Sequence, residues 1–173
     1  MIRNLVLAAS LAALPAAALA QTPPPPPPGA TAQAQPYLMA AGAGDVFEIT
    51  SSQVALQKSQ NPQVRRFATM LIDHHTTTTN NALVAAKSGG VTPPPPVLDQ
   101  NQRAMIGELM AAAPADFDRV FLAQQLPAHQ AALAVNQGYA QGGDVPALRQ
   151  AAAATVPVVR GHIAQVQRMQ AAM

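Results

Sequence analysis

The sequence predicts an all-α protein, an up-down four-helix bundle built from two αα-hairpins. Helix-forming Ala, Gln, Leu and Met dominate from Tyr37 onward. Pro and Gly punctuate this region only at wide intervals. The segments between these breaks are long, and their apolar residues follow the three-to-four spacing of one buried helix face. Four such helices joined in pairs by tight turns pack as two antiparallel hairpins.

The N-terminal segment over residues 1–20 is typical of a secretory signal peptide. Arg3 supplies the positive start, residues 5–14 form a short apolar run, and residues 18–20 give a small-x-small cleavage pattern. The run is too short for a membrane-spanning helix, which needs about 20 apolar residues. We therefore expect cleavage after Ala20 and a soluble mature chain without a transmembrane segment, either periplasmic or secreted.

Residues 21–36 are predicted to form a disordered, Pro-rich linker that precedes a bundle domain over residues 37–173. Six consecutive prolines, Pro23–Pro28, favour an extended polyproline II conformation and leave little to bury in a core. The linker is either a spacer or a ligand for a partner's groove. No flanking residues that would give specificity stand out, which favours the spacer.

The first hairpin joins helices expected over residues 38–59 and 62–88. The Asn-Pro pair at 61–62 is a helix start signal, because Asn caps a helix and Pro fits its first position. The Gly pair at 89–90 ends the second helix.

The second hairpin joins helices expected over residues 115–141 and 145–171. A short extra helix is expected over 99–112, in the connection between the hairpins. Pro127 and Pro157 lie inside the long helices, so we expect each to kink or split its helix.

The composition excludes several classes of function. The chain has no Cys, so it has no disulfide scaffold, thiolate metal site, cysteine nucleophile or lipid anchor on Cys. Aromatic residues make up 3%, Trp is absent and the net charge is only +2, so nucleic acid is not an expected partner. The sequence also lacks a Gly-rich phosphate loop and a Gly-x-Ser-x-Gly motif, which makes an enzyme less expected than a binding protein.

Three of the four histidines fall on the inner faces of three different long helices: His75, His129 and His162. The first helix contributes Glu48 on its inner face. Metal sites of helical bundles lie between facing helices at mid-height. One carboxylate and three imidazoles form a ligand set that suits Zn, Fe, Cu or Mn. The sequence therefore predicts a metal site in the middle of the bundle.

The distances of these residues from the helix turns predict their heights. Glu48 lies thirteen residues before Asn61 and His75 fourteen after it, so antiparallel packing places them side by side. His129 lies fourteen residues before the second turn and His162 nineteen after it. This second pair is offset by five residues, or about 7 Å at 1.5 Å per residue.

Further polar residues are secondary candidates. Asp73 and His74 flank His75, where they either fix its tautomer or are solvated. Asp118 lies eleven residues before His129 on the same face, and its charge also suits a helix start. A di-iron centre is improbable, because the chain holds only two Glu and no interior histidine follows a Glu by three residues.

Several motifs together resemble the bacterial domain-of-unknown-function family 4142. They are Phe47-Glu48-Ile49, Val54-Ala55-Leu56, the run from Asn61 to Ala68, His75-Thr76, Phe117-Asp118 with His129, and Val156-Pro157 with His162. The resemblance covers residues 37–169. It implies a ferritin-like four-helix bundle that is exported to the periplasm or outer membrane.

The resemblance also bears on the candidate ligands. Glu48, His129 and His162 match recurrent polar positions of the family, and His75 matches the histidine of its Asp-His pair. Here His74 stands where the family usually has the Asp.

Two hypotheses for the function remain open. The first is an exported metal-binding bundle that serves storage, buffering or stress protection. The second is a non-catalytic structural module that docks on an envelope protein partner, with the histidines bonded to one another or to water inside the core.

Overall fold

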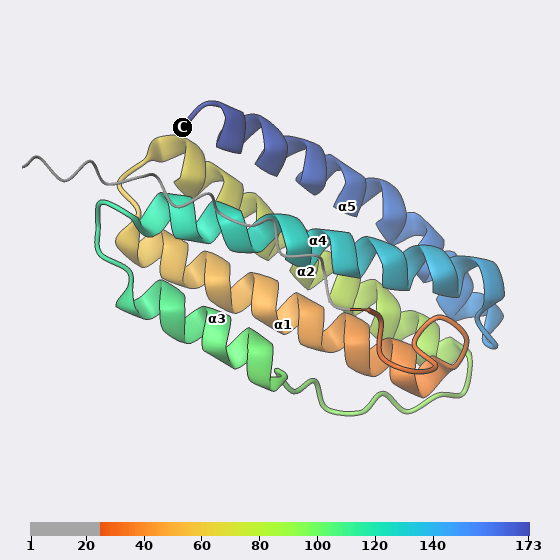
Figure 1. The fold of residues 1–173 in the computed structure, drawn as a ribbon. Coiled ribbons are helices and arrows are strands. Elements are labelled where there is room, and N and C mark those ends of the chain that lie inside the picture. The colour runs from red at the N-terminus through yellow and green to blue at the C-terminus, as the bar shows by residue number, and fades with distance from the viewer. Residues whose placement is uncertain (1–24) are drawn as a thin grey trace, which may run out of the picture.

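The computed structural model describes residues 25–173, and the predicted signal peptide lies outside this range. Five α-helices and no strand are found among the described residues. They are α1 (Ala34–Lys58), α2 (Pro62–Ser88), α3 (Gln100–Ala111), α4 (Phe117–Gly142) and α5 (Pro146–Ala171) (Figure 1). The prediction of an all-helical fold is confirmed. None of the helices in this range has the length and apolar character needed to cross a membrane.

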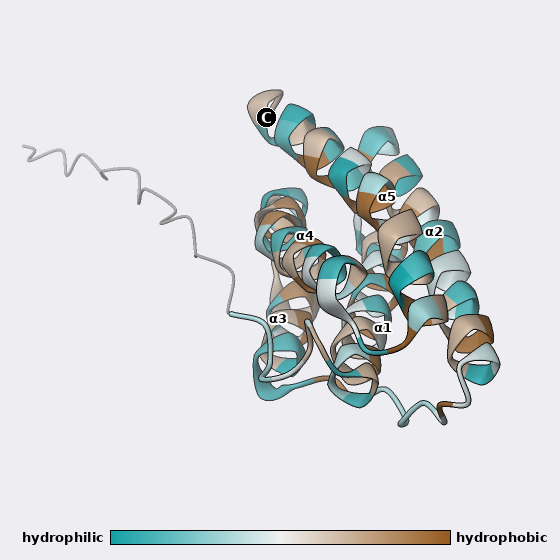
Figure 2. Ribbon diagram, turned by 90° about the vertical axis from the view of Figure 1, so that its right-hand side faces the viewer, coloured by the Kyte–Doolittle hydropathy of each residue, from teal (hydrophilic) through white to brown (hydrophobic). Residues whose placement is uncertain are grey.

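The four long helices enclose one interior. α1 packs on α2, α2 on α5, α5 on α4, and α4 on α1 (Figures 1 and 2). The short helix α3 contacts α1 and α4. The two hairpins predicted from the sequence, α1 with α2 and α4 with α5, have the most extensive contacts of all helix pairs.

The short helix α3 is held at both ends. Asp99 accepts a hydrogen bond from the backbone N–H of Gln102, and the Gln102 side chain accepts one from the N–H of Asp99, which forms a capping box. At the other end, Lys58 of α1 donates to the carbonyls of Leu109, Met110 and Ala112. A cation at this position satisfies carbonyls that have no partner within the helix.

The predicted boundary between linker and bundle needs a correction. Residues 28–32 form turns, and α1 begins at Ala34 rather than at residue 38, so residues 28–36 belong to the folded domain. Gly29 has a positive φ of 79°, Ala30 is buried, and the carbonyl of Ala32 accepts a hydrogen bond from the backbone N–H of Asp144. These contacts fix the segment against the α4–α5 turn.

The two internal prolines do not split their helices. Pro127 lies inside α4 and Pro157 inside α5, and both helices continue through them. Each proline removes one backbone donor from the helical ladder. The packing of α4 and α5 on each other outweighs this loss, so the alternative of a split helix is wrong.

The apolar core is divided into two clusters. The first cluster lies near the α1–α2 turn and the start of α4. Its largest members are Phe67, Phe117 and Phe121. The other lies near the start of α1 and contains Tyr37 and Tyr139, whose rings stack with centroids 4.0 Å apart. Buried polar residues occupy the layer between them: Glu48, Ser51, Ser52, His75, Gln125, His129 and His162.

Candidate metal centre

Three histidines from three helices meet in the polar layer. His75 comes from α2, His129 from α4 and His162 from α5, and all three side chains are buried. One ring nitrogen of each lies within 4.8 Å of those of the other two. Three of the four residues predicted as primary ligands are therefore close enough to share an ion.

His75 is oriented by a carboxylate that the sequence analysis did not single out. Its Nδ1 lies 2.7 Å from Oδ1 of Asp45 in α1. Thr78 and Thr79 donate hydrogen bonds to the same carboxylate, Thr79 at 2.6 Å. Because an ionised carboxylate only accepts, Nδ1 of His75 carries a proton. Its Nε2 is buried and has no hydrogen-bond partner among the described residues. The histidine thus presents a nitrogen ligand to the interior.

His129 is fixed in the same tautomer by the backbone of its own helix. Its Nδ1 lies 2.8 Å from the carbonyl oxygen of Gln125, which only accepts, so Nδ1 is the protonated nitrogen. The Nε2 lone pair then faces Nδ1 of His162 at 3.1 Å. This contact requires His162 to donate from Nδ1 when His129 is neutral.

His162 extends the chain of hydrogen bonds to the surface. Its Nε2 lies 2.8 Å from Nδ1 of His74, a residue of α2 that is exposed overall. With Nδ1 of His162 donating inward, Nε2 is the acceptor and Nδ1 of His74 is the donor. The Gln125 carbonyl at the inner end therefore sets the tautomer of His129. This in turn sets that of His162, and His162 sets that of His74.

Burial keeps two of the histidines neutral. Desolvation, reinforced by the neighbouring histidines, lowers the pKa of His129 to about 3 and that of His162 to about 2. Burial also disfavours the charged form of His75. The hydrogen bond that His75 donates to Asp45 and the charges of Glu48 and Asp45 outweigh this effect and raise the pKa of His75 above its usual value.

Glu48 lies beside the edge of the His129 ring that carries Nδ1. Its Oε1 is 3.6 Å from Nδ1 of His129, the nitrogen that points away from His162. The residue is only 3% exposed, and its Oε2 has no hydrogen-bond partner among the described residues. Burial raises the pKa of Glu48 to about 7, although the charge of His75 acts in the opposite direction. Glu48 is not among the residues whose ligand atoms all lie within 4.8 Å of one another.

The secondary candidates occupy other places. His74 contacts His162 and not His75, so it does not set the tautomer of its neighbour in sequence. Asp73 is exposed on the outer side of α2. Asp118 lies in the first turn of α4, where it suits the helix start.

One of the three pairs of ring nitrogens already has the spacing of a metal site. Nitrogens bound tetrahedrally at 2.0–2.1 Å lie about 3.3 Å from each other. His129 and His162 already present nitrogens 3.1 Å apart. Binding would require the loss of the proton on Nδ1 of His162, since its lone pair must then face the ion. Three imidazoles also leave one coordination position open for water or another ligand.

Comparison with known proteins places the chain in a family. The family model DUF4142, described as a domain of unknown function, matches residues 19–169. The chain belongs to this family, as the sequence motifs indicated. No curated protein matches the chain.

Solved structures share the fold at low sequence identity. A DUF305 fragment from Deinococcus radiodurans superposes with a TM-score of 0.71 at 18% identity, and the match covers 87% of this chain and 100% of that one. CopM in its Cu(II)-bound form gives a TM-score of 0.67 at 17% identity, covering 80% and 95% of the two chains. CopM in an Ag-bound form gives 0.65 at 19% identity, covering 79% and 94%.

Proposed function

We propose that this protein binds one transition-metal ion at the centre of an up-down, ferritin-like four-helix bundle. The ligands are Nε2 of His75, Nε2 of His129 and Nδ1 of His162. Asp45 is the carboxylate that orients the first of these rings, and the Gln125 carbonyl orients the second. The single observation that carries the proposal is the convergence of three buried histidines, whose ring nitrogens lie within 4.8 Å of one another and include the unpartnered Nε2 of His75.

A purely structural role explains this arrangement less well. Buried polar atoms in folded proteins are nearly always hydrogen-bonded, and one left without a partner costs about 1–3 kcal/mol. The chain that runs from Gln125 through His129 and His162 to His74 is satisfied at each step. His75 stands outside it, although the Asp45 carboxylate holds its ring firmly. An ion that binds His75 Nε2 gives this nitrogen a partner.

Copper is the ion that best fits the set of ligands. Imidazole nitrogens suit Zn, Cu and Fe, whereas Mn prefers oxygen ligands, and Glu48 lies outside the histidine group. In the Irving–Williams order Cu(II) binds a nitrogen site more tightly than Zn(II) or Fe(II). Structures of CopM with Cu(II) and with Ag, which share this fold, support the same choice.

The proposed role is the storage or buffering of metal in the cell envelope, as protection against metal stress. The signal peptide expected at residues 1–20 would deliver the chain to that compartment. A site with all three ligands buried and fixed by neighbouring groups favours retention of an ion over rapid turnover of a substrate.

Metal analysis of the purified chain from Gln21 onward tests the proposal. The protein is freed of metal, mixed in turn with Cu, Zn and Fe salts, desalted and assayed for bound metal. We expect one copper per chain and a higher Tm, because an ion that binds only the folded state stabilises it by about 2.7 kcal/mol at one hundred times its Kd. The variant His75→Ala, which leaves the other hydrogen bonds in place, should lose both effects.

Failure of all three metals to bind or to change the Tm would contradict the proposal and leave the histidines as structural residues. Metal bound equally by wild type and by His75→Ala would place the ion elsewhere in the chain.

A further inference from the structure

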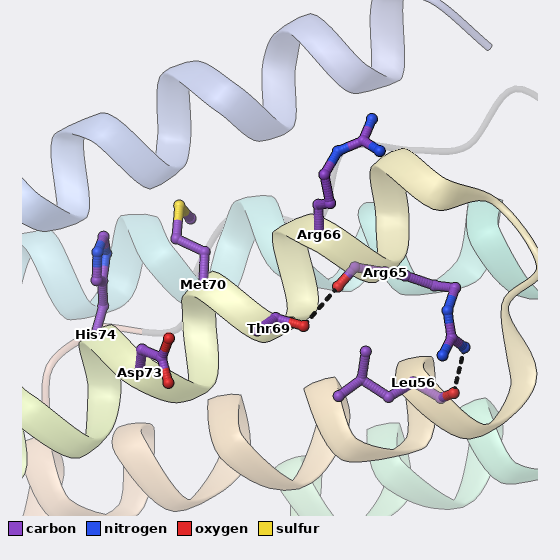
Figure 3. A pocket seen from close by; sticks show the side chains of 7 residues that line it. All are labelled: Leu56, Arg65, Arg66, Thr69, Met70, Asp73 and His74. Carbon is purple, nitrogen blue, oxygen red and sulfur yellow. Dashed lines mark hydrogen bonds between the residues drawn. The ribbon is translucent and has the colours of Figure 1, made fainter.

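The outer end of the histidine chain opens into a hollow on the surface of α2. The hollow has a volume of about 500 Å³, and its lining includes Met70, Asp73 and His74. Figure 3 shows Met70 and His74 pointing to the same side of α2, the side on which α5 lies. Their spacing of four residues places them on one helix face. A half-buried thioether and an exposed imidazole thus line the same hollow, and the imidazole contacts the buried ligand His162.

The hydrogen bond between His74 and His162 leaves the outer nitrogen of His74 free to bind a cation. Nδ1 of His74 donates to Nε2 of His162 in the arrangement derived above. The neutral ring then carries its lone pair on Nε2. Met70 adds a soft sulfur ligand, and Met sulfur selects soft ions such as Cu(I) over harder divalent ions.

The hollow carries negative charge at its His74 end and positive charge at its other end, where Arg66 points to the same side of α2 as Met70 (Figure 3). At the His74 end, Asp73 lies between Met70 and His74 along the helix. Two arginines line the rest of the hollow. The guanidinium group of Arg65 is engaged by the carbonyls of Leu56 and Ser59, at the end away from His74 (Figure 3).

We propose that Met70 and His74 form an outer binding site for a soft monovalent ion, Cu(I) or Ag(I), through which the ion reaches the buried histidines. This inference rests on the proposed function of the buried site. The His74–His162 contact is the link between the two sites, and Asp73 contributes negative charge beside the outer one.

The two sites differ in their ligands. The buried site offers three imidazoles, whereas the outer site offers one imidazole and one thioether. The first ion that binds the outer pair therefore passes on to the buried histidines and leaves Met70.

Methionine methyl NMR with Ag(I) tests the outer site directly. Ag(I) is redox-inert, and the six methionines from residue 21 onward give separate probes. In His75→Ala, which removes one buried ligand but keeps the chain from His129 to His74, Ag(I) should shift the methyl signal of Met70. The signal of Met110, which is 65% exposed on α3, is the internal control and should not move. An unmoved Met70 signal would overturn the proposal.

Loading kinetics test the path into the wild-type buried site. We expect Met70→Leu to slow the uptake of submicromolar Ag(I) by at least threefold and to leave the final stoichiometry and Kd unchanged. Met110→Leu is the matched control and should load at the wild-type rate. Equal rates for the two variants would overturn the role of Met70 in uptake.

The same experiments separate this inference from the proposed function. If the buried site binds no ion, Ag(I) in the wild type shifts the Met70 signal persistently, and a second equivalent does not restore it. If only the outer site is absent, the wild type binds one Ag(I) with no response of Met70 at any stage. Under the full proposal the Met70 signal of the wild type returns to its metal-free position once one equivalent has bound.

Discussion

Nδ1 of His75 lies 2.7 Å from Oδ1 of Asp45, while Nε2 on the opposite edge of the ring is buried without a hydrogen-bond partner among the described residues. A carboxylate that orients a histidine in this way raises the basicity of the free nitrogen and fixes its direction, as in many metal sites of proteins. The pair therefore explains how a chain with few charged residues positions a ligand in its interior.

Replacement of Asp45 tests this orienting role. Asp45→Ala should weaken copper binding by about 10–100-fold, the usual effect of losing such a partner. Asp45→Asn keeps an acceptor for Nδ1 without the charge and should give a smaller loss. Asp116→Ala, at an exposed carboxylate that pairs with Arg119, is the control and should bind like the wild type. Calorimetric titration measures all three, and equal affinities for the Asp45 and Asp116 variants would refute the role of Asp45.

Replacement of Glu48 should change how stability depends on pH. The pKa of Glu48 in the folded chain is about 7, above its ordinary value of 4.5, so the folded state binds more protons than the unfolded state between these values. Its contribution to the free energy of unfolding is thus greatest below pH 4.5 and is lost as pH rises through 7.

In metal-free protein, the wild type should therefore lose about 2–3 kcal/mol of this contribution to stability as the pH rises from 5 to 8, whereas Glu48→Gln has no carboxyl to ionise. The free energy of unfolding of Glu48→Gln minus that of the wild type should thus be about 2–3 kcal/mol more favourable at pH 8 than at pH 5. Urea unfolding at the two pH values measures this difference. If the free energies of unfolding of Glu48→Gln and wild type differ by the same amount at pH 5 and at pH 8, the carboxyl ionises normally in the folded protein.

Replacement of His129 separates binding from stability. His129→Leu removes the donor to the Gln125 carbonyl and the acceptor for His162, so the metal-free protein should lose about 1–3 kcal/mol of stability. The increase in Tm caused by copper should disappear as well. Thermal melts with and without copper give both quantities, and a variant that keeps the copper-dependent increase would exclude His129 as a ligand.

Lys58 is expected to anchor α3 to the rest of the fold. Its ammonium group donates to three carbonyls at the end of that helix and lies 5.6 Å from the centre of the Phe117 ring. Lys58→Met should lower the free energy of unfolding by about 2 kcal/mol, since hydrogen bonds from charged groups contribute 1.5–3 kcal/mol. Lys87→Met, at an exposed position, should change it by less than about 0.5 kcal/mol. Similar losses in the two variants would rule out a specific anchor.

The helices were predictable because local signals marked their ends. The Asn61 cap, Pro62 and the Gly89-Gly90 pair give the bounds of α2 as observed. The start of α1 was missed by four residues, because a Pro and Gly composition suggested an extended chain. The contact of Ala32 with Asp144 that fixes this segment joins residues distant in sequence, and no local signal reports it.

The histidine cluster was predictable in outline, and the sequence overestimated the offset between its members. Counted from the midpoint of the observed turn at Asp144, His129 lies fifteen residues before and His162 eighteen after. The remaining three residues correspond to about 4.5 Å. The length of two imidazole side chains spans this difference, which leaves their nitrogens 3.1 Å apart.

The sequence contains a signal for the role of Asp45. Asp45 lies sixteen residues before Asn61, and Thr78 seventeen after it, so antiparallel packing puts them level. His74 is different, because adjacent residues on a helix point about 100° apart. Its contact with α5 and not α1 depends on how the hairpins pack on each other, which the pattern of one helix does not reveal.

X-ray diffraction from crystals of the copper-loaded protein, with data collected on both sides of the copper absorption edge, tests the central claim most directly. We predict one anomalous peak in the polar layer of the bundle, about 2.0 Å from one ring nitrogen each of His75, His129 and His162. A loaded protein whose copper lies on the surface, with these three rings still bonded as in the metal-free chain, would contradict the account.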